Sequence, residues 1–140
     1  MPTASETLDR CPLFSTLSPK ARAKVAADLR ERRYAPGDAM TSEDQGGVGF
    51  FIIGEGTADV HIGEDVHART LGPGETFGEM ALITGQTRSA RITAQTDVQC
   101  WVMSQWHFKP LVLENPALAW ALLEQLAVRV RETQLRGTNS

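Results

Sequence analysis

The 140-residue sequence predicts a mostly β domain with helices at both ends. In the middle of the chain, all but one of the 12 glycines lie between residues 37 and 85, where they separate short apolar runs. Several of these runs alternate apolar and polar residues, as strands do when one face is buried. Near both ends, apolar residues instead recur at the spacing of an amphipathic helix. Closely spaced short strands indicate a small antiparallel barrel or roll.

Composition limits the kinds of partner and compartment. The net charge is −3, so no overall basic field attracts nucleic acid or an anionic membrane, and a bound anion needs a local site. No apolar stretch is long enough to span a membrane, and the polar N-terminus lacks the apolar segment of a signal peptide, so we expect a cytoplasmic protein. Cys11 and Cys100 lack the spacing of metal ligands and are expected to be reduced and partly buried.

The N-terminal part is expected to contain one helix. Residues 1–7 look like a loose start, and Ser18 can cap a helix that tolerates Pro19 in its first turn. Val25 and Leu29 then recur at helical spacing, which predicts a helix over about residues 19–30.

The strands are expected in the middle of the chain. Alternation and apolar runs place them at residues 50–53, 57–62, 66–71, 90–94 and along Val98, Cys100 and Val102. Turn sequences at residues 36–38 and 73–75 combine proline, glycine and an acidic residue.

Two helices are expected at the C-terminal end, over residues 106–113 and 116–134, followed by a frayed tail. Leu118, Leu122, Leu126 and Val130 form one stripe on the longer helix, which must lie on the roll, on another helix, or on both. Without an internal repeat or linker, residues 1–140 count as a single domain with its core over about residues 11–134.

Residues 77–90 contain the pattern that points to a ligand. A strand, Gly78 and then a short helix leave the backbone N–H groups of residues 79–82 without intrahelical partners, which makes a small anion site. Gly78 allows a ligand to approach the backbone. The planar guanidinium of Arg88 suits two oxygens of one phosphate. Glu79 can accept two hydroxyl hydrogen bonds, or pair with Arg88 when no ligand is present.

Two short segments together resemble the phosphate-binding cassette of the cyclic-nucleotide-binding domain family. They are Phe77-Gly78-Glu79-Met80-Ala81-Leu82 and Arg88-Ser89-Ala90. Segments at residues 12–14, 36–38, 51–56 and 71–74 match that family in order. The resemblance implies an eight-stranded antiparallel β-roll (a double-stranded jelly roll) with the cassette inserted, one N-terminal helix and two C-terminal helices.

The resemblance also implies reversible binding of cyclic AMP. Glu79 would accept the ribose 2′-hydroxyl and Gly78 would contact the ribose. Arg88 would hold the cyclic phosphate. The Ser89 hydroxyl and three backbone N–H groups would also bind the phosphate. These N–H groups belong to Ala81, Leu82 and Ala90, and Met80 lies in the same binding segment. Threonine in place of Ser89 favours cyclic GMP in this family, so cyclic AMP is the expected ligand and cyclic GMP the weaker alternative.

The family further implies an output through the C-terminal helix, which swings in as a lid over the base. Arg129, Thr133 and Trp120 are the candidate lid residues, and the same helix is expected to form a homodimer. An unidentified effector protein would read the movement.

Three alternatives remain open. The Glu79–Arg88 pair could serve structure alone. The chain could be a ligand-free interaction or dimerisation module, or a regulatory fragment of a larger transcription regulator.

His61 and His67 flank one turn without a third ligand, so we expect no metal site. The sequence contains no nucleophile constellation, so we expect no enzyme, and Trp101 and Trp106 are expected in the core.

Overall fold

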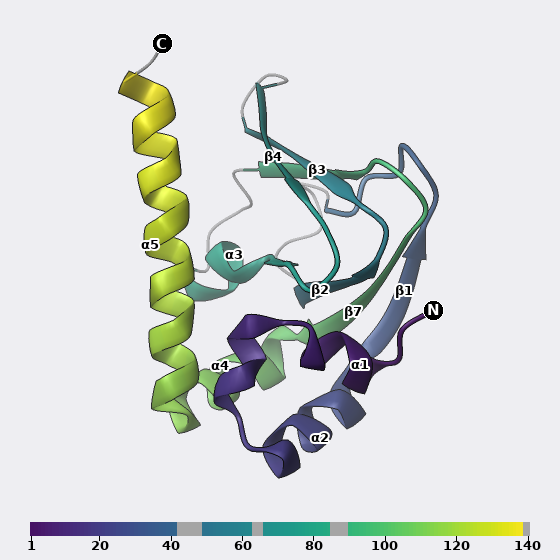
Figure 1. The fold of residues 1–140 in the computed structure, drawn as a ribbon, viewed down its shortest axis with the longest axis vertical. Coiled ribbons are helices and arrows are strands. Elements are labelled where there is room, and N and C mark those ends of the chain that lie inside the picture. The colour runs from purple at the N-terminus through teal and green to yellow at the C-terminus, as the bar shows by residue number, and fades with distance from the viewer. Residues whose placement is uncertain (42–48, 63–65, 85–89, 139–140) are drawn as a thin grey trace.

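The computed structural model describes residues 1–41, 49–62, 66–84 and 90–138 (Figure 1). The elements in chain order are α1 Ala4–Asp9, η1 Pro12–Thr16, α2 Pro19–Asp28, β1 Arg30–Tyr34, β2 Gly49–Glu55, β3 Ala58–Ile62, β4 Val66–Leu71, β5 Thr76–Phe77, α3 Glu79–Thr84, β6 Ala90–Ala94, β7 Val98–Ser104, α4 Gln105–Glu114 and α5 Pro116–Thr138.

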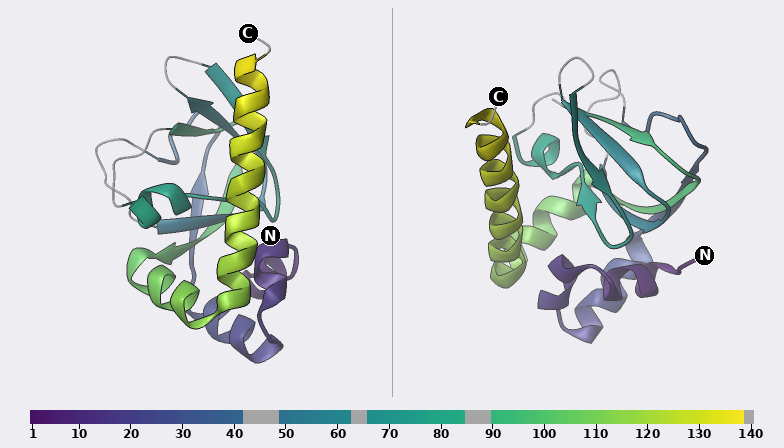
Figure 2. Two further views of the ribbon diagram at one scale, coloured as in Figure 1. Left: turned by 90° about the vertical axis from the view of Figure 1, so that its left-hand side faces the viewer. Right: turned by 45° about the horizontal axis from the view of Figure 1, so that its top comes forward.

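The strands form two antiparallel sheets, one with the order β1-β7-β2-β5 and one with the order β4-β3-β6. The helices α1, α2 and α4 gather at one end of the sheets, and α5 runs along one side of the molecule, which faces the viewer in the left view of Figure 2 (Figures 1 and 2). The described residues contain seven strands, whereas eight were expected. Ala39 makes only a single bridge, to Thr93, which is too short to form a strand.

The core has two parts, separated by the larger sheet. Phe50 and Ile52 of β2 face the helical end, whereas Phe51 and Ile53 face the space enclosed by the two sheets. Side chains of a strand alternate between its faces, so β2 is buried on both sides over Gly49–Gly54. The Phe50 ring stacks on Phe108 of α4 at 5.0 Å between centroids, which fixes α4 against this sheet.

The N-terminal segment differs from the expectation of a loose start followed by one helix. Thr3 and Glu6 form a capping box that starts α1, because each side chain accepts a hydrogen bond from the other residue's backbone N–H. Leu8 then anchors α1 in the core. The expected helix over residues 19–30 is confirmed but ends at Asp28, and an unexpected strand, β1, follows.

Both C-terminal helices are confirmed, and α5 extends further than expected, to Thr138. Only Leu118 and Leu122 of the predicted apolar stripe are buried, whereas Val130 is exposed. Trp106 was expected in the core, but it lies on the outer side of α4 and is 77% exposed. Within the described ranges no single helix is both long enough and apolar enough to cross a membrane. The segments Gln105–Glu114 and Pro116–Glu132 meet these criteria only when they are taken together, and the chain bends by 109° between them.

Candidate functional site

A strand, a glycine and a short helix do occur where the sequence predicted the cassette. Phe77 of β5 pairs with Phe51 of β2, and their rings stack at 4.6 Å. Gly78 then adopts a φ of 100°, which favours glycine because a Cβ would strain this backbone. The chain turns there, so Glu79 becomes the first residue of α3.

Glu79 is a buried carboxylate with a cationic partner from the far end of the chain. Its side chain is 2% exposed, and Arg129 of α5 donates from Nη1 to its Oε1. The same guanidinium donates from Nη2 to the Thr76 carbonyl oxygen at 2.6 Å. Among the described residues no donor reaches Glu79 Oε2, which is buried as well. A buried carboxylate is costly unless it is paired, so Arg129 offsets much of the cost of placing Glu79 here.

Further polar side chains of α5 contact the same region of the roll. Gln125 donates from Nε2 to the Thr76 hydroxyl at 2.8 Å. Glu132 lies 4.0 Å from Arg69 of β4, and Arg69 in turn pairs with Glu75 at 2.9 Å. We call Gln125, Arg129 and Glu132 the polar seam of α5.

Arg129 was expected as a possible lid residue, and the structure brings it directly onto Glu79. Gln125, which contacts the same region of the roll, was not expected from the sequence. A signal was available, since Leu118, Leu122, Gln125 and Arg129 fall on one helical face and the character of that face changes from apolar to polar at Gln125.

The remaining candidates lie in several places. Met80 is exposed and Leu82 packs partly against the core. Ala81 lies within α3, Thr133 within α5, and Ala90 starts β6 opposite Ile62. Trp120 is 65% exposed and lies about half a turn around α5 from Arg129. Arg88 and Ser89, and with them the expected Glu79–Arg88 pair, lie outside the described residues.

No candidate metal site emerges in the part of the chain that the structure describes. His61 and His67 are strand partners across β3 and β4, as expected from the sequence. The described residues nevertheless contain no group of three or more histidine, cysteine or acidic side chains arranged to hold an ion.

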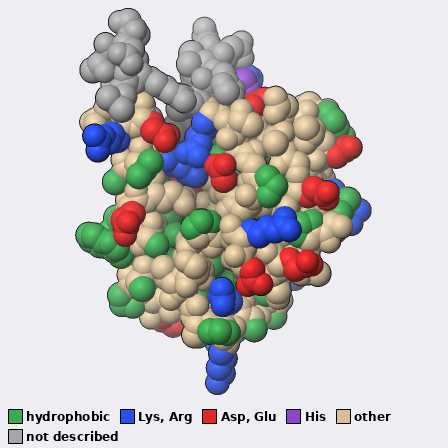
Figure 3. Space-filling model, in the orientation of Figure 1, with side chains coloured by type: hydrophobic (Ala, Val, Ile, Leu, Met, Phe, Trp, Pro, Cys, Tyr) green, Lys and Arg blue, Asp and Glu red, His purple; other side chains and the backbone are tan. Residues whose placement is uncertain are grey.

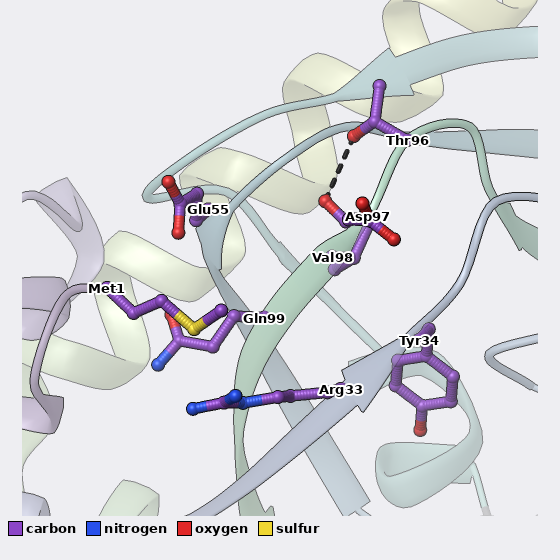
Figure 4. A pocket seen from close by; sticks show the side chains of 8 residues that line it. All are labelled: Met1, Arg33, Tyr34, Glu55, Thr96, Asp97, Val98 and Gln99. Atoms are coloured by element: carbon purple, nitrogen blue, oxygen red, sulfur yellow. Dashed lines mark hydrogen bonds between the residues drawn. The ribbon is translucent and has the colours of Figure 1, made fainter.

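A separate pocket of about 480 Å³ shares no residue with the cassette (Figure 4). It is lined by Met1, Arg33, Tyr34, Glu55, Thr96, Asp97, Val98 and Gln99. At its floor the buried Gln99 amide donates to Glu31 and to the Pro2 carbonyl, both at 2.9 Å, which ties the N-terminal segment to the larger sheet. We therefore assign this pocket to the packing of the N-terminus.

Comparison with known proteins gives consistent results. A family model described as "Cyclic nucleotide-binding domain" matches residues 31–115. Among curated proteins, a cAMP-dependent protein kinase regulatory subunit of Colletotrichum orbiculare is 33% identical over 106 residues. That match covers 75% of this chain and 27% of the relative, so the chain spans only about a quarter of that relative's length.

Two solved structures share the fold. A structure described as cAMP-bound PfPKA-R superposes with a TM-score of 0.85 at 26% identity, covering 95% of this chain and 46% of that one. The catabolite activator protein of Thermus thermophilus superposes with a TM-score of 0.78 at 28% identity, covering 89% of this chain and 61% of that one.

Proposed function

The chain belongs to the cyclic nucleotide-binding domain family, and from that premise we propose that it is a regulatory sensor that binds cyclic AMP on residues 77–90. The observation that carries the proposal is the second carboxylate oxygen of Glu79. Oε1 is held by Arg129, whereas Oε2 is buried and no described residue donates to it. Leaving a buried acceptor unsatisfied costs about 1–3 kcal/mol, and a ribose hydroxyl that donates to Oε2 removes this cost.

Arg129 also makes the site electrostatically suitable for an anion. The cyclic phosphate carries a negative charge, and an unpaired Glu79 carboxylate beside it would repel the ligand. Pairing with the Arg129 guanidinium offsets that repulsion while leaving Oε2 for the ribose. The ligand therefore meets a carboxylate that is already neutralised and oriented.

Arg88 supplies the remaining part of the proposed site. It follows Glu79 at the family's spacing, and its planar fork matches two phosphate oxygens. Gly78, Met80 and the backbone N–H groups of Ala81, Leu82 and Ala90 complete the cradle. Position 89 is serine and not the threonine that favours cyclic GMP in this family, which supports cyclic AMP as the ligand. Solved relatives at 26% identity are described with cAMP or a cAMP analogue bound.

The proposed output is a movement of α5 and not a chemical reaction. Among the contacts of the described residues, Arg129 of the polar seam joins α5 to Glu79 of the cassette, while Leu118 and Leu122 anchor the base of the helix in the core. Ligand binding at Glu79 therefore acts directly on the half of α5 that contains Arg129, where Leu126 is only partly buried, and Thr133 is a further candidate lid residue in this half. A separate effector protein would read this shift between two helix positions.

Isothermal titration with cyclic AMP tests the proposal, using wild type, Arg88→Ala and a matched control. Losing one partner of a buried charge pair costs about 2–5 kcal/mol, so Arg88→Ala should weaken binding by about 30-fold or more. Arg91→Ala removes the same kind of side chain from an exposed position on β6 and should leave the affinity unchanged. Equal affinities of Arg88→Ala and Arg91→Ala would contradict the proposal at this residue.

A second copy of the chain is the partner that α5 favours, although not through the stripe expected from the sequence. Leu118 and Leu122 are buried within their own chain and are not free for a partner. Instead Trp120, Leu123, Ala127 and Val130 are exposed at intervals of three, four and three residues, which is the spacing of a coiled-coil seam. On the face in Figure 3, exposed apolar side chains lie along the margin where α5 runs. We propose a homodimer through this second stripe.

A further inference from the structure

Thr76 receives two hydrogen bonds from α5. Gln125 donates to its hydroxyl at 2.8 Å, and Arg129 donates to its carbonyl oxygen at 2.6 Å. Gln125 and Arg129 are four residues apart, so both lie on the same face of the helix, one turn from each other. Two bonds from successive turns to a single residue fix both the rotation and the height of α5 relative to the roll.

Thr76 is a rigid place to attach a helix. The residue is 1% exposed, and β5 pairs it with Ile52, which is fully buried in the core. Only Phe77 and Gly78 separate it from Glu79, and the φ of 100° at Gly78 restricts the turn between them. A helix that is held on Thr76 is therefore also held in register with Glu79.

The outermost contact of the polar seam is weaker. Glu132 and Arg69 are 4.0 Å apart, with side chains that are 51% and 30% exposed. Exposed ion pairs of this kind contribute little to stability and are screened by salt. The part-buried bond between Gln125 and Thr76 is the stronger of the two contacts, because losing the Thr76 hydroxyl would leave a partly buried amide without its acceptor.

We propose that Thr76 and Gln125 are positioning residues that dock α5 over the cassette before any ligand arrives. Their bond keeps Arg129 on Glu79, so the carboxylate is oriented in advance with Oε2 left for a donor. The consequence for ligand affinity rests on the proposed function, whereas the docking of α5 does not. Pre-organisation of this kind raises apparent affinity, since a larger population of the binding-competent state lowers the population penalty that the ligand must overcome.

Hydrogen exchange of the ligand-free protein tests the docking. Thr76→Val has a similar shape but lacks the acceptor, and we expect amides of α5 beyond residue 122 to exchange about tenfold faster in this variant. Thr76→Ser keeps the hydroxyl and should exchange at nearly the wild-type rate, which a purely packing role of the threonine methyl group would not produce. Gln125→Leu should match Thr76→Val, and amides of β2 should exchange equally slowly in every variant.

Two exchange results would overturn the proposal. If Thr76→Val exchanged like wild type, the bond would not hold α5. If Thr76→Ser exchanged as fast as Thr76→Val, the methyl group and not the hydroxyl would matter.

A cyclic AMP titration of the same variants tests the consequence for binding. We expect the Kd of Thr76→Val to rise about tenfold, with Thr76→Ser close to wild type. Tighter binding by Thr76→Val would overturn the proposal, because docked α5 would then block the ligand. If wild type bound no cyclic nucleotide, the proposed function would fail, while the exchange measurement would still decide whether Thr76 and Gln125 dock the helix.

Discussion

Replacing Arg129 by methionine removes the cation from a carboxylate that is 2% exposed. Breaking a buried ion pair by removing one partner typically costs about 3–5 kcal/mol. The Arg129 side chain remains 21% exposed, and water screens the pair from that side, so the lower end of this range applies. Its bond to the Thr76 carbonyl is lost as well. We therefore expect Arg129→Met to lower the free energy of unfolding by about 3 kcal/mol.

Urea denaturation followed by circular dichroism measures this loss. With a slope of about 2 kcal/mol per molar urea, the midpoint of Arg129→Met should fall by roughly 1.5 M. Arg131→Met is the matched control, because it removes an exposed arginine from the same helix and should change little. The double variant with Glu79→Gln should recover most of the stability, since no buried charge is then left unpaired. A midpoint for Arg129→Met equal to that of Arg131→Met would refute the reasoning.

Three further results are expected. Ser89→Thr should shift the ratio of the two dissociation constants towards cyclic GMP by about 0.5–1.5 kcal/mol, measured by titration with both nucleotides, and an unchanged ratio would remove this position from the specificity argument. Burial raises the pKa of Cys11 to about 11 and that of Cys100 to about 12 in the folded protein. In the unfolded chain both thiols ionise near pH 9, so the unfolded state gains stability relative to the folded state as the pH rises above 9. Urea midpoints should therefore fall above pH 9, and midpoints that stay constant from pH 8 to 10.5 would contradict this expectation. Leu123→Glu should convert a dimer into a monomer in analytical ultracentrifugation, and a wild type that is monomeric at micromolar concentration would exclude the dimer.

The sequence predicted the elements whose burial leaves a periodic pattern. The strands β2, β3, β4, β6 and β7 alternate or form apolar runs, and all five were found close to their expected positions. The strand β1 escaped detection because its first four residues are exposed at the edge of the sheet, so it has no buried face to create alternation. Two-residue β5 exists only through its pairing with β2, a tertiary contact. In contrast, α1 had a local signal in Thr3 and Glu6 that was overlooked.

In the candidate site too, some residues have a local sequence signal and others depend on tertiary contacts. Gly78 and Glu79 could be identified from the sequence, because a local motif determines the turn and the helix start. The ion pair between Glu79 and Arg129 joins residues 50 positions apart, and no local pattern specifies that partner. The resemblance to a family suggested Arg129 as a candidate lid residue but did not suggest Thr76, whose contacts depend on how α5 packs against β5.

The most direct test of the central claim compares cyclic AMP with 2′-deoxy cyclic AMP by isothermal titration of the wild-type protein. The two ligands differ only in the ribose 2′-hydroxyl, which would donate a hydrogen bond to Glu79 Oε2. A hydrogen bond to a charged group contributes about 1.5–3 kcal/mol, so we expect cyclic AMP to bind roughly 10- to 150-fold more tightly than the deoxy ligand. Glu79→Gln should reduce this difference. Equal affinity of the wild type for both ligands, or no binding of either, would contradict the assignment of Glu79 as the ribose acceptor.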